Sequence, residues 1–170
     1  MKIVGHGLRE HIRFLRPLFG LLFVVFLLRL MLGAAGAPLW LTRLFSVTGA
    51  APGAVLIAVL MIHARRFGSY TNVVVASLLL NCCGQLLIIL AIIFSVFTGI
   101  SNIFMRPEFS MRGDDPHHWL HIYGHLTFGI GLFTLLGAGM GCLLLWILRL
   151  LVPVQSNPLT GRGTNAVTRR

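Results

Sequence analysis

The residues YTNVVVASLLLNCCGQLLIILAIIFSVFT, numbers 70–98, decide the fold class, because they contain no charged side chain. As a helix of about 28 residues, this stretch would be roughly 42 Å long, against a membrane hydrocarbon core of about 30 Å. The run therefore predicts a membrane-spanning helix that tilts or projects beyond the bilayer.

Three more apolar runs repeat this pattern along the chain. The predicted spans are 17–36, 44–64, 70–98 and 119–151. Pro17 is expected near the start of the first helix, where its missing N–H costs nothing. The composition, 56% hydrophobic and 11% charged, is typical of integral membrane proteins rather than soluble ones. The sequence thus predicts an all-α integral membrane protein, a single domain of four transmembrane helices over residues 1–152.

The two flanks of this domain are basic. Residues 6–16 carry one apolar and one arginine stripe at helical spacing: Leu8, Ile12 and Leu15, and Arg9, Arg13 and Arg16. The stripes favour a short amphipathic helix in the headgroup plane, with a merely basic cytoplasmic tail as the alternative. The amino-terminal run has the layout of a signal peptide, but Arg29 interrupts it and Pro38 would follow the cut, which favours a retained anchor. Residues 153–170 are expected to be a disordered basic tail.

The distribution of arginine and lysine between the spans predicts their orientation, in a chain with a net charge of +10. In a four-span arrangement one side carries most of the basic residues: Lys2, Arg9, Arg13, Arg16, Arg65, Arg66, Arg149, Arg162, Arg169 and Arg170. The other side has Arg43, Arg106 and Arg112. This asymmetry predicts cytoplasmic termini and contact with anionic lipid, in a bacterial inner (plasma) membrane by default. Nucleic-acid binding is disfavoured, because no compact soluble domain remains to present a basic face.

Small and polar residues predict how the spans pack. Lipid tails are as apolar as leucine, so close packing and hydrogen bonds must hold the helices together. Gly137 and Gly141 are spaced as a small-xxx-small contact, and Ser77, Asn81 and Gln85 lie four apart on one face of the third span. We expect both faces to be buried against neighbouring helices.

Helical rise places four polar residues at a similar depth in the membrane. They are Arg29, Asn81, Gln85 and Thr127. An arginine about 18 Å into a span usually faces protein or water. We therefore expect an intramembrane polar cluster in which Arg29 donates to the side-chain oxygen of Asn81 or Gln85. The alternative is that Arg29 extends outward to the headgroups.

A histidine-rich stretch precedes and begins the fourth span. His117, His121 and His125 are spaced four apart, and Asp114 or Asp115 could complete a Zn²⁺ or Cu²⁺ shell. The alternative is an interfacial belt of His, Trp and Tyr. The acids also suit the start of the helix, with Asp114 or Asp115 as N-cap and Pro116 at the first helical position.

Haem is a weaker interpretation of these histidines. Bis-histidine ligation needs two imidazoles that converge from opposite sides, usually from different helices. His63 is predicted near the cytoplasmic edge, most of a bilayer away from His121.

Catalysis and proton pumping have no support in the sequence. There is no Gly-x-Ser-x-Gly, phosphate loop or Cys-x-x-Cys, and all four acids lie outside the predicted spans. The predicted function is therefore non-enzymatic: an accessory or scaffold subunit that packs against other membrane proteins or against itself. The alternative is a metal- or haem-binding membrane protein that uses the outward-facing histidines.

Overall fold

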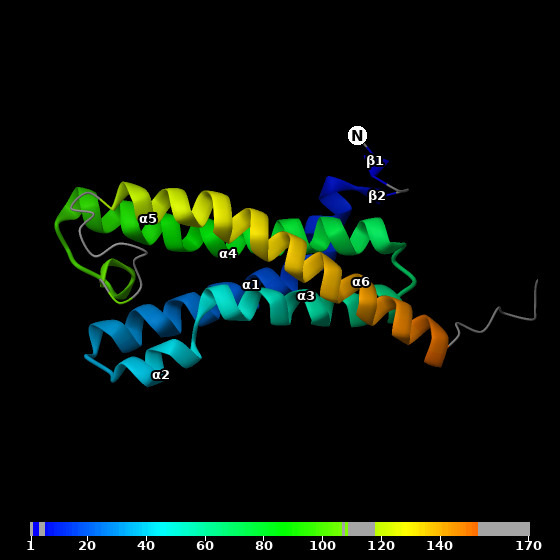
Figure 1. Cartoon of the computed structure of the whole chain (residues 1–170), viewed down its shortest axis with the longest axis horizontal. Coiled ribbons are helices and arrows are strands. Elements are labelled where there is room, and N and C mark those ends of the chain that lie inside the picture. The colour runs from blue at the N-terminus through cyan, green and yellow to red at the C-terminus, as the bar shows by residue number, and fades with distance from the viewer. Residues whose placement is uncertain (1, 4–5, 107, 109–117, 153–170) are drawn as a thin grey trace, which may run out of the picture.

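The computed structural model describes residues 2–3, 6–106, 108 and 118–152, and this part of the chain is almost entirely helical (Figure 1). A two-residue antiparallel pairing, β1 (Lys2–Ile3) with β2 (His6–Gly7), opens it. The helices are α1 (Leu8–Ala34), α2 (Leu39–Leu44), α3 (Val47–Ala64), α4 (Tyr70–Thr98), the 3-10 turn η1 (Ile103–Met105), α5 (Trp119–Gly124), the π-helix η3 (His125–Leu132) and α6 (Phe133–Leu151).

Four helical stretches are long and apolar enough to cross a membrane. They are Leu8–Ala34, Leu39–Ala64, Tyr70–Thr98 and Trp119–Leu151. The prediction of an all-helical bundle with four such helices is confirmed. The second stretch consists of α2 and α3, and the fourth joins α5, η3 and α6 end to end.

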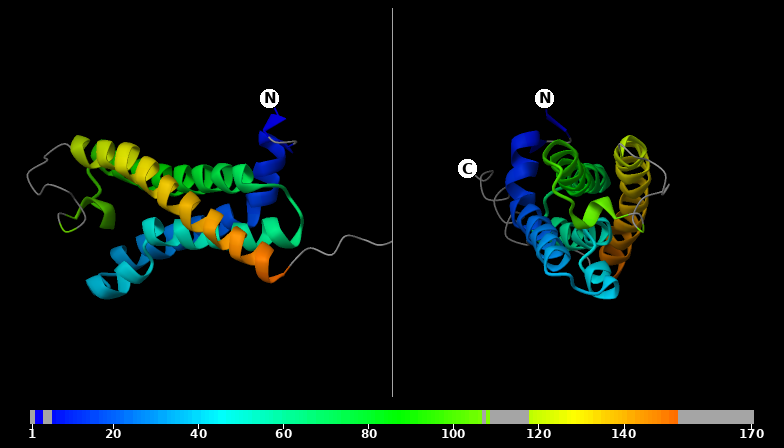
Figure 2. Two further views of the ribbon diagram at one scale, coloured as in Figure 1. Left: turned by 45° about the vertical axis from the view of Figure 1, so that its right-hand side comes forward. Right: turned by 90° about the vertical axis from the view of Figure 1, so that its left-hand side faces the viewer.

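The first span differs from its prediction. α1 begins at Leu8 and contains Pro17 in its interior, so the expected separate headgroup helix forms the first turns of α1. The carboxylate of Glu10 accepts from the Gly7 N–H at 2.7 Å and satisfies a donor at the helix start. The buried face passes through the proline, because Leu15 and Leu18 on either side of it are both buried. These buried contacts favour continuing the helix, and its first turns run at an angle to the rest (Figure 2).

The main core lies where α1, α3, α4 and α6 meet. α3 contributes mostly alanine and valine to it: Ala51, Ala54, Val55, Ala58, Val59 and Ile62. Small side chains let the helix backbones approach closely, which membrane helices need because burial in lipid gives no hydrophobic gain. A second cluster at the other end gathers Phe26, Ile88, Ile92 and the η1 residue Phe104.

α4 and the fourth span run antiparallel in a constant register. A Cβ on Gly141 would lie 2.7 Å from Val73, and one on Gly137 would lie 2.6 Å from the Ser77 hydroxyl. One turn further along α4, Asn81 Nδ2 donates to the Phe133 carbonyl at 3.3 Å. The residues predicted to pack against neighbouring helices are all buried: Gly137, Gly141, Ser77, Asn81 and Gln85.

The π-helix η3 helps to keep this register. On a regular α-helix, positions four residues apart drift by about 40° per step, because one turn takes about 3.6 residues. The i→i+5 bonds of η3 put more residues into each turn and offset part of the drift. His121, His125 and Gly129 therefore continue the inward face that α6 presents.

The spans alternate in direction, so the start of α1 and the end of α6 lie at the same end of the bundle (Figure 1). Two contacts at this end join them to the first turn of α4 and to the α3–α4 loop. Asn72 accepts from buried His11 at 2.9 Å, and Arg149 donates to the Gly68 carbonyl at 3.1 Å. At the opposite end, a Cβ on Gly33 of α1 would lie 2.6 Å from Ile103 of η1.

Candidate functional site

The helix that contains the histidines begins later in the chain than the predicted aspartate N-cap requires. α5 starts at Trp119, and His118 before it has a φ of 55°, in the left-handed region. A residue in that conformation interrupts a helix, so the fourth span does not extend back through His118 to an aspartate N-cap. His117, Asp114, Asp115 and Pro116 themselves lie outside the described residues.

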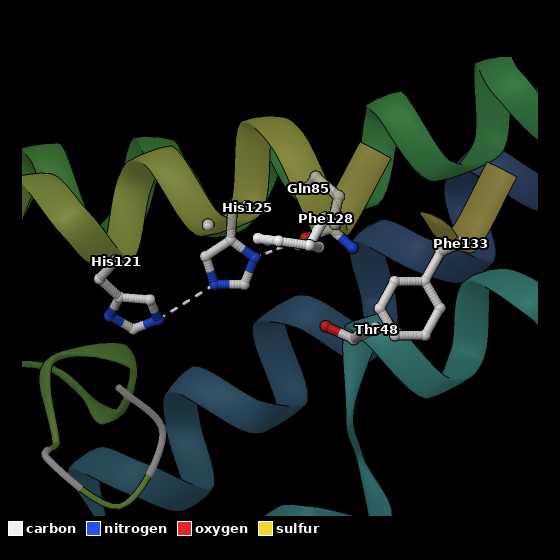
Figure 3. A pocket seen from close by; sticks show the side chains of 8 residues that line it. Thr48, Gln85, His121, His125, Phe128 and Phe133 are labelled. Atoms are coloured by element: carbon white, nitrogen blue, oxygen red, sulfur yellow. Dashed lines mark hydrogen bonds between the residues drawn. The ribbon is translucent and has the colours of Figure 1, made fainter. Parts of the chain in front are cut away.

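His121 and His125 face into the bundle from successive turns and form a hydrogen-bonded chain with α4 (Figure 3). The two Nε2 atoms lie 3.1 Å apart, and His125 Nδ1 lies 2.6 Å from Gln85 Oε1. An amide oxygen only accepts, so His125 Nδ1 carries the proton. The neutral ring of His125 then has its lone pair on Nε2, and His121 Nε2–H donates to it.

A glycine makes this contact possible. Gly129 lies one turn after His125, and a Cβ there would lie 2.7 Å from Oε1 and Cδ of Gln85. Such a distance is well inside van der Waals contact, so a larger residue at 129 would push Gln85 away from His125. The glycine thus positions the Gln85 amide between the two helices.

The histidine pair and Gln85 border a cavity of about 160 Å³. The lining residues come from α3, α4 and the fourth span: Thr48, Gln85, His121, Gly124, His125, Phe128, Gly129 and Phe133. The Gln85 side chain is fully buried, and its Nε2 has no hydrogen-bond partner among the described residues.

Arg29 of α1 contacts residues of α2–α3 and η1. It is only 5% exposed, and its Nη1 donates to the Ser46 hydroxyl at 3.5 Å while its guanidinium lies 5.0 Å from the centre of the Phe104 ring. Ser46 also accepts from the Gly49 N–H at 3.3 Å and caps α3. The guanidinium is thus held between the start of α3 and η1, and little of the side chain is exposed.

The other members of the predicted polar cluster have different partners. Asn81 donates to the Ser77 carbonyl at 2.9 Å, and Gln85 accepts from His125, so the expected hydrogen bond from Arg29 to either amide is not seen. Thr127 donates at 2.8 Å to the Tyr123 carbonyl in its own helix. The hydrogen bonds of Asn81, Gln85 and Thr127 therefore do not join these residues to one another.

The predicted metal ligands are partly described. Two imidazole nitrogens on one tetrahedral Zn²⁺ at about 2.0 Å are roughly 3.3 Å apart, close to the observed separation of His121 and His125 Nε2. Within the described ranges, no group of three His, Cys, Asp or Glu residues could hold an ion. The structure therefore brings together two of the four predicted ligands. His63 lies near Arg149 at the opposite end of the bundle, and it is not brought to His121 as a haem partner would be.

Sequence reasoning missed Thr48, Phe128 and Phe133 as members of this site. One usable signal existed: His121, His125, Gly129 and Phe133 continue the four-residue spacing of Gly137 and Gly141. Thr48 had no such signal, because only the packing of α3 against the fourth span brings it to the cavity.

No family model matches the chain, and no curated protein or solved structure matches it either.

Proposed function

We propose that the protein is a small, non-enzymatic, multi-pass subunit that packs against another membrane protein, or a second copy of itself, through the outer face of its fourth span. The supporting observation is a pair of outward-facing glycines. A Cβ added at Gly131 or Gly139 would have no described atom within 4 Å, and both residues are exposed. Leu135 between them is 72% exposed.

Glycine in a helix interior costs about 1 kcal/mol relative to alanine. Gly129, Gly137 and Gly141 offset this cost with close contacts inside the bundle. Gly131 and Gly139 make no such contact with the described chain. Small residues on a lipid-facing surface let the backbone of a further helix approach, which is the main source of helix association in lipid. An external helix on this face would explain them.

The proposed orientation has the start of α1 and the end of α6 in the cytoplasm of a bacterial inner membrane. Arg9, Arg65 and Arg149 lie at that end of the bundle, and Arg43 lies at the other. An excess of arginine on the cytoplasmic side is the usual arrangement. Reporter fusions at the carboxyl terminus test it: activity of a reporter that works only outside the cytoplasm would contradict the orientation.

The association is tested with the double substitution Gly131→Leu and Gly139→Leu. Gly20→Leu in α1 is the matched control, because Gly20 is also exposed and a Cβ there would meet no described atom within 4 Å. We expect the parent and the control to purify in mild detergent with a stoichiometric partner or as a defined oligomer. The double variant should purify alone. A parent that is monomeric and without partners, or a double variant that keeps them, would refute the proposal.

A second candidate function is metal binding at the outer end through His121 and His125. The observation in its favour is that Gln85 holds His125 Nδ1–H and leaves its Nε2 lone pair facing His121. Metal-ligating histidines are commonly oriented by such a second hydrogen bond. A ligand that binds only the native state must raise the melting temperature. Added Zn²⁺ or Cu²⁺ should therefore stabilise the parent and not the His121→Ala/His125→Ala variant; equal melting curves with and without metal would exclude this candidate.

A further inference from the structure

The cavity beside Gln85 has the size of a single ring. Its volume is about 160 Å³. An engineered apolar protein cavity of about 150 Å³ binds benzene, so a six-membered ring fits a space of this size. Two phenylalanines, Phe128 and Phe133, border the cavity (Figure 3). Aromatic side chains pack favourably against a flat ring, either stacked or edge to face.

The polar groups at the cavity indicate what such a ring must carry. Gln85 Oε1 is occupied by His125, so the amide presents its Nε2–H groups, which have no acceptor among the described residues. A buried donor without an acceptor destabilises the folded protein, because it has lost its hydrogen bond to water. Thr48 adds a hydroxyl to the lining. A ligand oxygen that accepts from Gln85 would satisfy the amide.

The position of the cavity indicates how a ligand would reach it. Phe128 is 56% exposed on the lipid-facing side of the fourth span, so this wall of the cavity borders the bilayer. A molecule dissolved in the membrane could enter past Phe128 without crossing water. Any apolar tail attached to the ring could remain among the lipid chains.

We propose that this cavity binds the ring of a membrane-soluble carbonyl compound, of the quinone class, with one carbonyl oxygen accepting from Gln85 Nε2. The site is distinct from the glycine face that carries the subunit proposal. It also needs no metal, because it uses the Gln85 amide rather than the histidine Nε2 atoms.

The test uses the full-length protein, purified in detergent and treated with a chelator, and a short-chain benzoquinone as the probe. Binding is measured by calorimetry. Gln85→Glu keeps an oxygen for His125 and removes the amide donor, and Thr48→Phe fills the cavity from α3. Gln85→Glu should weaken binding about fivefold or more, the factor that corresponds to the lower end of the cost of an unmade buried hydrogen bond. Thr48→Phe should weaken binding at least as much, because it leaves no room for the ring. Thr127→Val is the control, because Thr127 bonds within its own helix and does not line the cavity.

A second probe distinguishes the contribution of the carbonyl group to binding from that of the ring. Toluene fits the same volume but offers no acceptor, so it should bind more weakly than the quinone, by about fivefold or more. Equal affinity for the two probes, no saturable binding to the parent, or unchanged binding to Thr48→Phe would each overturn the proposal. Circular dichroism of every variant establishes that the helices are intact. Should Gln85→Glu fail to fold, Thr48→Phe and toluene still decide the outcome.

Discussion

Gly141→Ala should destabilise the bundle, and the expected size follows from the contacts of one methyl group. The added Cβ would lie 2.7 Å from Val73 Cγ1, 3.1 Å from Val59 Cγ2 and 3.4 Å from Val55 Cγ1. These valines belong to α3 and α4, are fully buried, and have stiff χ1 angles. Overpacking of such a site typically costs about 1–3 kcal/mol.

Gly139→Ala is the matched control two residues earlier in the same helix. Its Cβ would meet no described atom within 4 Å. Both substitutions gain the same helix propensity, about 1 kcal/mol. The difference between the two variants therefore isolates the steric term, and we expect Gly141→Ala to be less stable than Gly139→Ala by about 1–3 kcal/mol.

The assay is thermal or denaturant unfolding in detergent, followed by circular dichroism. Adding Val73→Ala removes the nearest methyl groups, so the double variant should show a favourable coupling energy of at least about 0.5 kcal/mol with Gly141→Ala. Equal stability of Gly141→Ala and Gly139→Ala, or strict additivity with Val73→Ala, would refute the close packing of α6 on α4.

Three further predictions concern the ends of the bundle. Asn102→Ala should lower the unfolding free energy by about 2 kcal/mol, because Asn102 makes three hydrogen bonds that fasten η1, each worth about 0.5–1.5 kcal/mol; unchanged stability would contradict this role. Arg29→Lys keeps the charge but loses the planar contact with Phe104, and it should lower the melting temperature by an amount equivalent to about 0.5–2 kcal/mol. In a protein that already carries Phe104→Leu, adding Arg29→Lys should cause no further loss; an equal loss in both backgrounds would contradict this contact. Phe67→Leu removes a ring stacked 4.1 Å from Phe14 and should speed amide hydrogen exchange in the first turns of α1. An unchanged exchange rate would show that this contact does not stabilise the start of the helix.

The sequence predicted correctly which helix faces are buried where those faces carry small or polar residues at helical spacing. Gly137 and Gly141 were expected at a helix contact, and both are buried against α4. Ser77 and Asn81 were expected on an inward face, and both are fully buried. These predictions depend only on helical spacing and on the small number of ways a polar group can be satisfied in lipid.

The boundary at Pro17 was predicted less well. Proline favours the first turn of a helix, which suggested a break between the amphipathic segment and the first span. In the structure Leu15 and Leu18 pack into the same core on both sides of the proline, and tertiary packing offsets the lost hydrogen bond.

The sequence alone determined that four helices of this chain can cross a membrane, because length and apolar composition decide that without reference to any neighbour. The tertiary structure decided which polar groups meet. Arg29 and Gln85 were expected together from their depth, yet Arg29 lies against Ser46 and Gln85 binds His125. Depth follows from counting residues along one helix, whereas a contact also depends on how two helices are rotated and crossed. The π-helix η3 and the close approach at Gly129 set that rotation for the fourth span. The four-residue spacing marks Gly129 as part of an inward face, but it does not say which residue of α4 the glycine meets.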